Sequence, residues 1–198
     1  VFAALSASQV QALTNTQVTN LSTTNVAALT ATQLNSLKST QITQLSSTQV
    51  NTISTSTLAT VKGSQLALMS TQQVHDLATS SVANLTTAQI AAIEVSDLAV
   101  IGVEIFAGLN SAQVRALNTA QLNGLTTNQL AGLNSSWVSS LSTAQLRSLE
   151  ATKLNVLDAA SLAAITDAQI IGLTTDQIAG LSNSTIESLN TVAVSALR

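Results

Sequence analysis

The chain has 198 residues, of which 45% are hydrophobic and only 8% are charged, and it contains no Cys, Pro or Tyr. Its six basic residues are scattered, which excludes the basic stripe that a nucleic-acid surface needs, and no apolar run reaches the length of a membrane span. The absence of Cys excludes a disulfide framework and a thiolate metal site.

A large aliphatic residue recurs every eight positions, from Leu5 through Leu13 and Leu21 to Leu197, without insertion or deletion. Five residues after it comes a second apolar position, which is Val, Leu or Ile in every unit except the one that has Phe106. The first residue of the polar string between them is Ser, Thr, Asn or Asp in 18 of 24 units, and the fourth is Gln in 14 of 24. The chain is therefore a tandem repeat of about 24 octads.

The octad has the pattern of a helix start. Ser or Thr followed three residues later by Gln is a capping box, in which the hydroxyl and the Gln side chain each accept a main-chain N–H. The apolar residues that flank the box stand at the positions of a hydrophobic staple. Thr14 and Gln17, flanked by Leu13 and Val18, show both patterns. We expect a helix of six or seven residues to begin in most octads.

Such short helices are unstable alone and must stack on one another. One long helix is disfavoured, because eight residues overshoot two turns and the apolar stripe would drift by about 80° per repeat. We therefore predict an all-α solenoid of very short helices, one per octad, joined by corners of one or two residues. It runs as a single domain over residues 1–198, with a degenerate stretch at 94–109. Small residues before each Leu suit a tight helix end or a close backbone approach.

A β-solenoid is the alternative fold. Thr, Val, Ile and stacked amide side chains favour it. Against it, the apolar spacing alternates between five and three, and odd spacings send successive apolar side chains to opposite faces of a flat strand.

The sequence resembles the octapeptide arrays, of the Leu-Thr-Thr-Ala-Gln-Ile-Ala-Ala type, that occur in large secreted or surface proteins of bacteria. Residues 85–92 and 173–180 carry this resemblance best. It implies an extracellular or cell-surface role as a stalk, matrix or fibre component, and it carries no catalytic residues to transfer.

No catalytic, cofactor-binding or metal-binding residues are predicted. His75 beside Asp76 is interpreted as a surface pair, because no second ligand or nucleophile accompanies it. Asp158, Asp167 and Asp176 are nine residues apart and either bind a cation weakly or form a solvated face. Trp137 replaces a Gln and is either an exposed anchor for a partner or folded back over an adjacent groove.

The degenerate stretch is either a tolerated drift or kink in the solenoid, which is the commoner case, or an exposed apolar patch for lateral association. If chains associate, we expect contacts at its apolar residues and at the two chain ends, which carry no polar cap. The candidates are Val95, Val103, Ile105, Phe106, Val1, Phe2, Val194 and Leu197.

These features predict a structural, self-assembling repeat protein of a bacterial cell exterior, a filament, fibre or stalk subunit whose partner is another copy of itself. We expect it not to be an enzyme and to need no cofactor. The alternative function is a surface-binding module, adhesive or ice-binding, carried on a repeat spacer.

Overall fold

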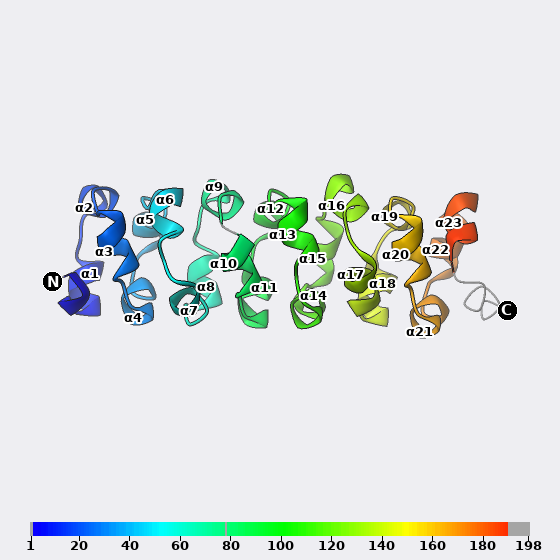
Figure 1. Ribbon diagram of the computed structural model, residues 1–198, viewed down its shortest axis with the longest axis horizontal. Helices are drawn as coiled ribbons and strands as arrows, with labels where there is room; N and C mark the ends of the chain where they lie inside the picture. Colours follow the sequence, from blue (N-terminus) through cyan, green and yellow to red (C-terminus); the bar gives the residue numbers. More distant parts are fainter. Residues whose placement is uncertain (1, 78, 190–198) are drawn as a thin grey trace. The chain divides into compact units, whose positions relative to one another are not determined.

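The computed structural model describes residues 2–77 and 79–189, which form a succession of short helices without any β-strand (Figure 1). The prediction of an all-α solenoid is confirmed, and the β-solenoid alternative is wrong. No described helix is both long enough and apolar enough to cross a membrane.

The chain divides into two compact units, residues 1–101 and 102–198. The division falls inside the degenerate stretch, and a single continuous solenoid over the whole chain stays a prediction. In unit 1, a 3₁₀ turn at Phe2–Ala4 precedes α1 (Ala7–Gln11), α2 (Asn15–Thr19), α3 (Thr23–Ala27), α4 (Ala31–Leu34), α5 (Ser39–Ile42), α6 (Ser47–Val50), α7 (Thr55–Leu58), α8 (Gly63–Leu66), α9 (Thr71–His75), α10 (Thr79–Ala83), α11 (Thr87–Ala92) and α12 (Val95–Leu98). Unit 2 contains α13 (Val103–Ala107), α14 (Ser111–Ala116), α15 (Thr119–Asn123), α16 (Thr127–Ala131), α17 (Ser135–Ser140), α18 (Thr143–Ser148), α19 (Ala151–Leu154), α20 (Ala159–Ala163), α21 (Asp167–Ile171), α22 (Thr175–Gly180) and α23 (Asn183–Ser188).

Most helices are shorter than the six or seven residues that the sequence predicted. The shortest, such as α4, have four residues, and the longest, such as α11, have six. Each ends in a tight turn in which the N–H of the next repeat's first residue donates to the carbonyl three residues earlier, as Leu13 does to Val10. The first residue of the next repeat and the N-cap that follows it both have an extended backbone. Around α11, the N-cap Thr86 before the helix has φ −71° and ψ 161°, and Ile93, the first residue of the repeat after it, has φ −65° and ψ 132°. This two-residue corner agrees with the prediction.

Three helices complete one turn of the coil within each unit. In unit 1, α1 packs on α4, α3 on α6, and α8 on α11; in unit 2, α14 packs on α17, α17 on α20, and α20 on α23. Neighbouring turns therefore bring together residues about three octads, or 24 positions, apart in the sequence. The sequence of one octad determines where a helix begins and ends. The number of helices per turn determines which octads contact one another.

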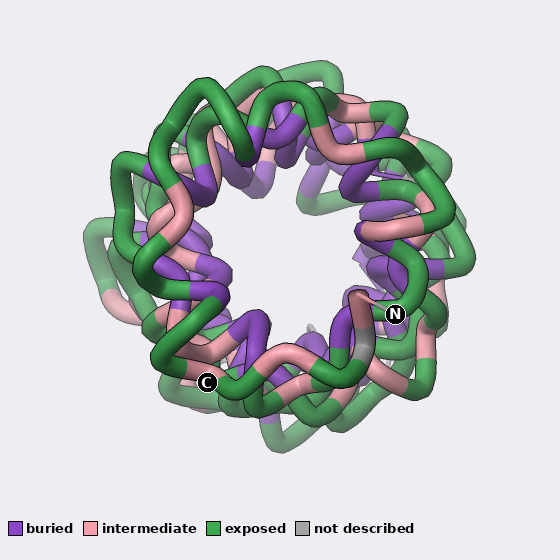
Figure 2. The backbone as a smooth tube through the Cα atoms, turned by 90° about the vertical axis from the view of Figure 1, so that its left-hand side faces the viewer, coloured by how far each residue is buried: buried purple, intermediate pink, exposed green. Residues whose placement is uncertain are grey.

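The first and sixth positions of the octad form the core of each unit. Buried residues lie on the inner side of the coiled chain and exposed residues on its outer side (Figure 2). Most of these core side chains are aliphatic and nearly inaccessible, for example Ile90, Leu98, Leu122 and Ile170. In unit 1, residues of both positions surround an apolar cavity of ≈ 40 Å³. The inward faces of most described helices are therefore buried against helices of their own and adjacent turns.

The small residue at the eighth position allows turns to approach closely. A Cβ atom on Gly172 would lie 2.0 Å from Cγ2 of Thr143, and one on Gly132 would lie 2.1 Å from Cγ1 of Val103. In both pairs the eighth position faces the third position of the octad three repeats earlier. Among the described glycines none has positive φ, so these residues serve the close approach and not a left-handed helix end.

Replacing Gly172 with Ala should lower the free energy of unfolding by roughly 1–3 kcal/mol, because the new methyl group must displace Thr143 or its backbone. The midpoint of urea unfolding, followed by circular dichroism, measures this change. Gly108→Ala is the matched control at the same octad position, since its Cβ would meet nothing closer than 3.4 Å. Equal effects of the two substitutions would contradict the close-approach role of Gly172.

Candidate functional site

The predicted capping box is present at the start of most helices. In α11, the main-chain N–H of Gln89 donates to the Thr86 hydroxyl at 3.3 Å, and the N–H of Thr86 donates to Oε1 of Gln89 at 2.8 Å. The same reciprocal pair, with Gln at the fifth octad position, begins α1, α2, α4, α6, α9, α14, α15, α16, α18, α21 and α22. Two N–H groups that a helix start leaves without partners are satisfied in this way.

The same Gln side chain also connects neighbouring turns. Nε2 of Gln89 donates to the main-chain carbonyls of Val61 at 2.6 Å and Leu58 at 2.7 Å. These acceptors lie 28 and 31 residues earlier in the sequence. Equivalent bonds run from Gln65 to Leu37 and Leu34, Gln73 to Leu45 and Ile42, Gln145 to Leu117 and Val114, Gln169 to Leu141 and Val138, and Gln177 to Leu149 and Leu146. We call this set of inter-turn bonds the amide ladder.

The ladder acceptors are carbonyls at a helix end and in the corner that follows it. Leu58 is the last residue of α7, and Val61 begins the next octad. Carbonyls at a helix C-terminus have no partner within the regular α-helix. The Gln amide therefore satisfies the start of its own helix through Oε1 and helix-end carbonyls of the preceding turn through Nε2. One side chain joins the two turns along the direction in which the coil grows.

Burial makes the ladder energetically important. Gln89 is 1% exposed and lies among apolar residues of the core. A buried polar group is tolerated when it is hydrogen-bonded, and leaving one donor or acceptor without a partner costs about 1–3 kcal/mol. Removing the Gln89 amide would leave two main-chain groups without a partner, the N–H of Thr86 and the carbonyl of Val61, because the Leu58 carbonyl still accepts the N–H of Val61 at 3.0 Å.

Two other residue types at the fifth octad position also donate a hydrogen bond to the preceding turn. Nζ of Lys153 donates to the carbonyl of Leu125 at 2.8 Å, and Oγ of Ser161 donates to the carbonyl of Leu133 at 2.9 Å. Both acceptors are 28 residues earlier, as in the bonds made by Gln. We call each such side chain, with the carbonyls to which it donates, a rung of the ladder. Lys153 and Ser161 therefore supply, like Gln, a donor aimed at the preceding turn.

A second set of inter-turn bonds comes from the seventh octad position. Nδ2 of Asn155 donates to the carbonyl of Gly180 at 2.9 Å, and its Oδ1 accepts the main-chain N–H of Ser182 at 2.9 Å. In the octad of Ser182, Thr185 stands where most octads have Gln. The side chain of Asn155 therefore accepts the N–H of the N-cap Ser182, which a Gln would otherwise accept. Nδ2 of Asn123 and Nε of Arg115 make the corresponding bonds to the carbonyls of Ser148 and Ser140.

Trp137 replaces one rung with an aromatic contact. The residue is 2% exposed, so its interpretation as an exposed anchor is wrong. Its ring stacks at a tilt on Phe106, with centroids 5.8 Å apart, and its indole N–H is buried without a hydrogen-bond partner. Phe106 lies 31 residues earlier, where a Gln rung would find a carbonyl. In this pair, aromatic packing takes the place of the hydrogen bonds.

Asp97 stands at a ladder position but cannot donate while it is ionised. Its side chain is 4% exposed and accepts the hydroxyl of Thr71 at 2.8 Å. The ladder acceptors for this position would be the carbonyls of Met69 and Leu66, 28 and 31 residues earlier. A carboxylate offers them no hydrogen, so this rung is missing from unit 1.

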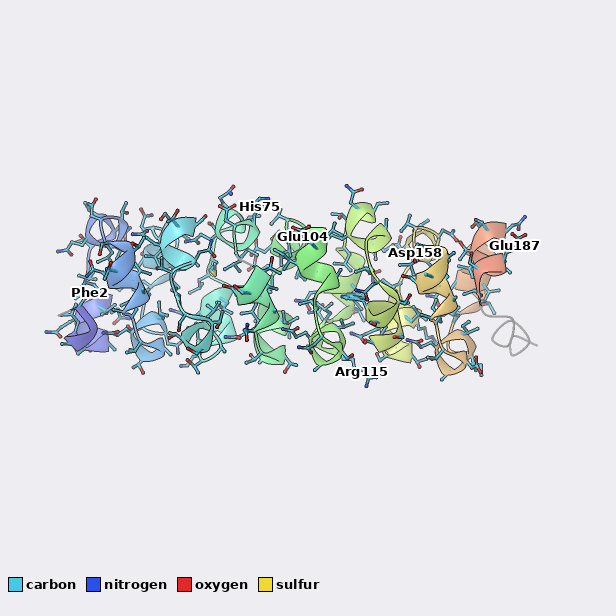
Figure 3. All side chains as sticks on the ribbon, viewed as in Figure 1. Phe2, His75, Glu104, Arg115, Asp158 and Glu187 are labelled. Carbon is cyan, nitrogen blue, oxygen red and sulfur yellow. The ribbon has the colours of Figure 1, made fainter. Side chains whose placement is uncertain are left out.

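His75 and Asp76 lie on the outer surface of unit 1, at the end of α9, where His75 projects away from the coil (Figure 3). The Asp76 carboxylate accepts hydrogen bonds from Gln72 at 2.8 Å and from Ser47 of α6 at 2.6 Å, and it contacts Nδ1 of His75 at 2.8 Å. These bonds, that of Gln72 foremost, lower the pKa of Asp76 to about 2. The pair therefore links two adjacent turns on the surface.

Asp158, Asp167 and Asp176 have separate local roles. Asp158 is the N-cap of α20, and its carboxylate accepts the main-chain N–H of Ser161 at 2.7 Å, which lowers the pKa of Asp158. Asp167 and Asp176 lie exposed in the first turns of α21 and α22. Within the described parts of the chain, no three His, Cys, Asp or Glu side chains are grouped so that they could hold a metal ion.

The residues predicted for self-association occupy different environments. Val95 is exposed in unit 1, Val103 is half-buried in unit 2, and Phe2 is half-buried at the start of unit 1. Ile105 and Phe106 are buried in the core of unit 2, so they add nothing to an exposed apolar patch. Val1, Val194 and Leu197 lie outside the described residues.

Sequence reasoning identified Gln as a capping residue and missed its inter-turn role. The signal was available: Glu serves a capping box as well as Gln does, yet the fifth octad position contains Gln in 14 of 24 units and Glu in none. A carboxylate accepts from the N-cap but cannot donate to a carbonyl. The exclusion of Glu therefore indicates that this side chain must also donate.

Comparison with protein families supports the repeat architecture. Residues 90–135 and 106–143 match the family described as ALTTAQ repeat. The match confirms a tandem repeat chain, and the fold shows that each repeat contributes one short helix. No curated protein gave a significant match.

Replacing Gln89 with Met, which preserves length and removes every polar atom, should lower the free energy of unfolding by about 2 kcal/mol or more, at about 1–3 kcal/mol for each of the two groups left without a partner. Gln9→Met is the matched control, because Gln9 caps α1 at an exposed position and should cost only about 1 kcal/mol. Urea unfolding of the two variants measures the difference. Losses of equal size would show that Gln serves only as a cap.

Proposed function

We propose that the protein is a structural, self-assembling repeat protein of a bacterial cell exterior, a filament, fibre or stalk subunit. The observation that carries the proposal is the direction of the amide ladder. Within each unit, buried Gln side chains donate to main-chain carbonyls of the preceding turn, as Gln89 does in unit 1 and Gln145 in unit 2. Such a coil can be extended by any further turn of the same kind, because stability rests on nearest-neighbour interfaces.

The surface chemistry supports an architectural and not a catalytic role. The polar side chains are mainly Ser, Thr, Asn and Gln, and Asp158 and Asp76 act in a helix cap and in an inter-turn bond, respectively. The buried Gln, Ser and Asp residues at the fifth position are engaged in the same structural contacts. The extracellular location rests on the resemblance to octapeptide arrays of bacterial surface proteins and on the low content of charge.

Electron microscopy of the purified chain at rising concentration, with far-ultraviolet circular dichroism of the same samples, tests the proposed function. We expect filaments of uniform width that lengthen with concentration and retain a helical spectrum. Chains that remain isolated short rods at every concentration would contradict self-assembly and would favour a spacer that carries a binding module.

A further inference from the structure

Asp97 places a carboxylate in the interior of unit 1 without a matching positive charge. The residue is 4% exposed, and its Oδ1 accepts the hydroxyl of Thr71 at 2.8 Å, whereas its Oδ2 has no donor among the described residues. Helices α9 and α12 pack on each other here, and neither contains Lys or Arg. The one His of α9, His75, contacts Asp76 on the outer surface. A buried carboxylate is costly unless it is paired and hydrogen-bonded, so this site calls for a cation that can donate.

The carbonyls that the missing rung would reach also lack a side-chain donor. In the described part of the chain, the carbonyl of Met69 accepts no hydrogen bond, and that of Leu66 accepts only the main-chain N–H of Met69, at 3.0 Å. Unit 2 shows which other group suits such a place, because Nζ of Lys153 donates to the carbonyl of Leu125 at 2.8 Å. A ladder position therefore accepts an ammonium group in place of a Gln amide.

The three residues of the missing rung line one small cavity, which we call the Asp97 cavity. Besides Asp97, Met69 and Leu66 its wall is aliphatic, and its volume is ≈ 10 Å³. A cavity of roughly this size holds one water-sized group, and an ammonium group is of that size. Leu66 and Met69 also line the apolar cavity of ≈ 40 Å³ in unit 1, so the two cavities share a wall. Because Met is unbranched and flexible, a change of the Met69 rotamer would join them.

We propose that unit 1 binds a small primary ammonium ligand, with its charged head in the Asp97 cavity and its alkyl group in the apolar cavity. The head pairs with the Asp97 carboxylate and donates to the Met69 carbonyl, which completes the missing rung as Lys153 completes its own. A primary ammonium has three N–H donors, enough for Oδ2 and for both ladder carbonyls. The site lies inside unit 1 and does not depend on self-assembly.

The two cavities predict an order of affinity among simple cations. Ammonium supplies the head without an alkyl group, and ethylammonium supplies both. Burial of each methylene should strengthen binding about fourfold, so ethylammonium should bind at least about fourfold more tightly than ammonium. Tetramethylammonium has the charge but no N–H donor, and it is too large for the Asp97 cavity, so it should not bind.

Urea unfolding of the full chain, followed by circular dichroism, measures this binding when each chloride salt replaces sodium chloride at constant ionic strength. A ligand that binds only the folded state raises the unfolding midpoint as its concentration increases. We expect ethylammonium to raise the midpoint at lower concentration than ammonium does, and tetramethylammonium to leave it at the sodium value. Equal midpoints in ethylammonium and sodium would overturn the site and would indicate that water alone serves Asp97.

Three variants locate the binding. Asp97→Asn preserves the shape of the side chain and removes its charge, so it should fold and lose the response to ethylammonium. Asp167→Asn is the matched control, because it removes an exposed carboxylate from α21 and should respond like the unmodified chain. Val61→Ile adds a methyl group to the wall of the apolar cavity and should weaken the binding of ethylammonium about fourfold while that of ammonium stays unchanged. A response that Asp97→Asn retains, or that tetramethylammonium reproduces, would be a general salt effect and would overturn the proposal.

Discussion

The structure depends most on finding hydrogen-bond partners for the main-chain groups at helix ends, because its helices have only four to six residues. A regular helix leaves its first N–H groups and its last carbonyls without partners, so in helices this short most main-chain groups belong to an end. The Gln of the octad resolves both ends at once. Its Oε1 caps the helix to which it belongs, and its Nε2 reaches helix-end carbonyls of the preceding turn.

This double use accounts for the rest of the architecture. The inter-turn bonds span 28 and 31 residues because three octads complete a turn, and each turn must approach closely enough for a side-chain amide to reach the main chain. Gly172 and Gly132 permit that approach where they face branched side chains. The aliphatic residues at the first and sixth positions then fill the interior, and the hydrophobic stabilisation comes from neighbours in the coil and not from any single helix.

The local structure could be predicted from the sequence, because capping boxes and apolar spacing act within one octad. Thr86 and Gln89 occur at the spacing of a box, and the structure forms it. The number of octads per turn could not be predicted, since it depends on how short helices pack against one another over long sequence separations. The contact between Trp137 and Phe106 could not be predicted for the same reason, because only the three-helix turn brings these residues together. The burial of Ile105 and Phe106 follows from their inward octad positions, which the loss of the surrounding capping pattern obscured.

The central claim is that an amide donor at the fifth octad position holds adjacent turns together, and Asp97 offers the most direct test because its rung is missing. Urea unfolding should show that Asp97→Gln stabilises the protein by about 1–2 kcal/mol, through new hydrogen bonds to the carbonyls of Met69 and Leu66. Asp97→Leu should stabilise it less, since Leu removes the buried carboxylate without supplying a donor. Equal stability of the Gln and Leu variants, or a Gln variant no more stable than the unmodified chain, would contradict the account.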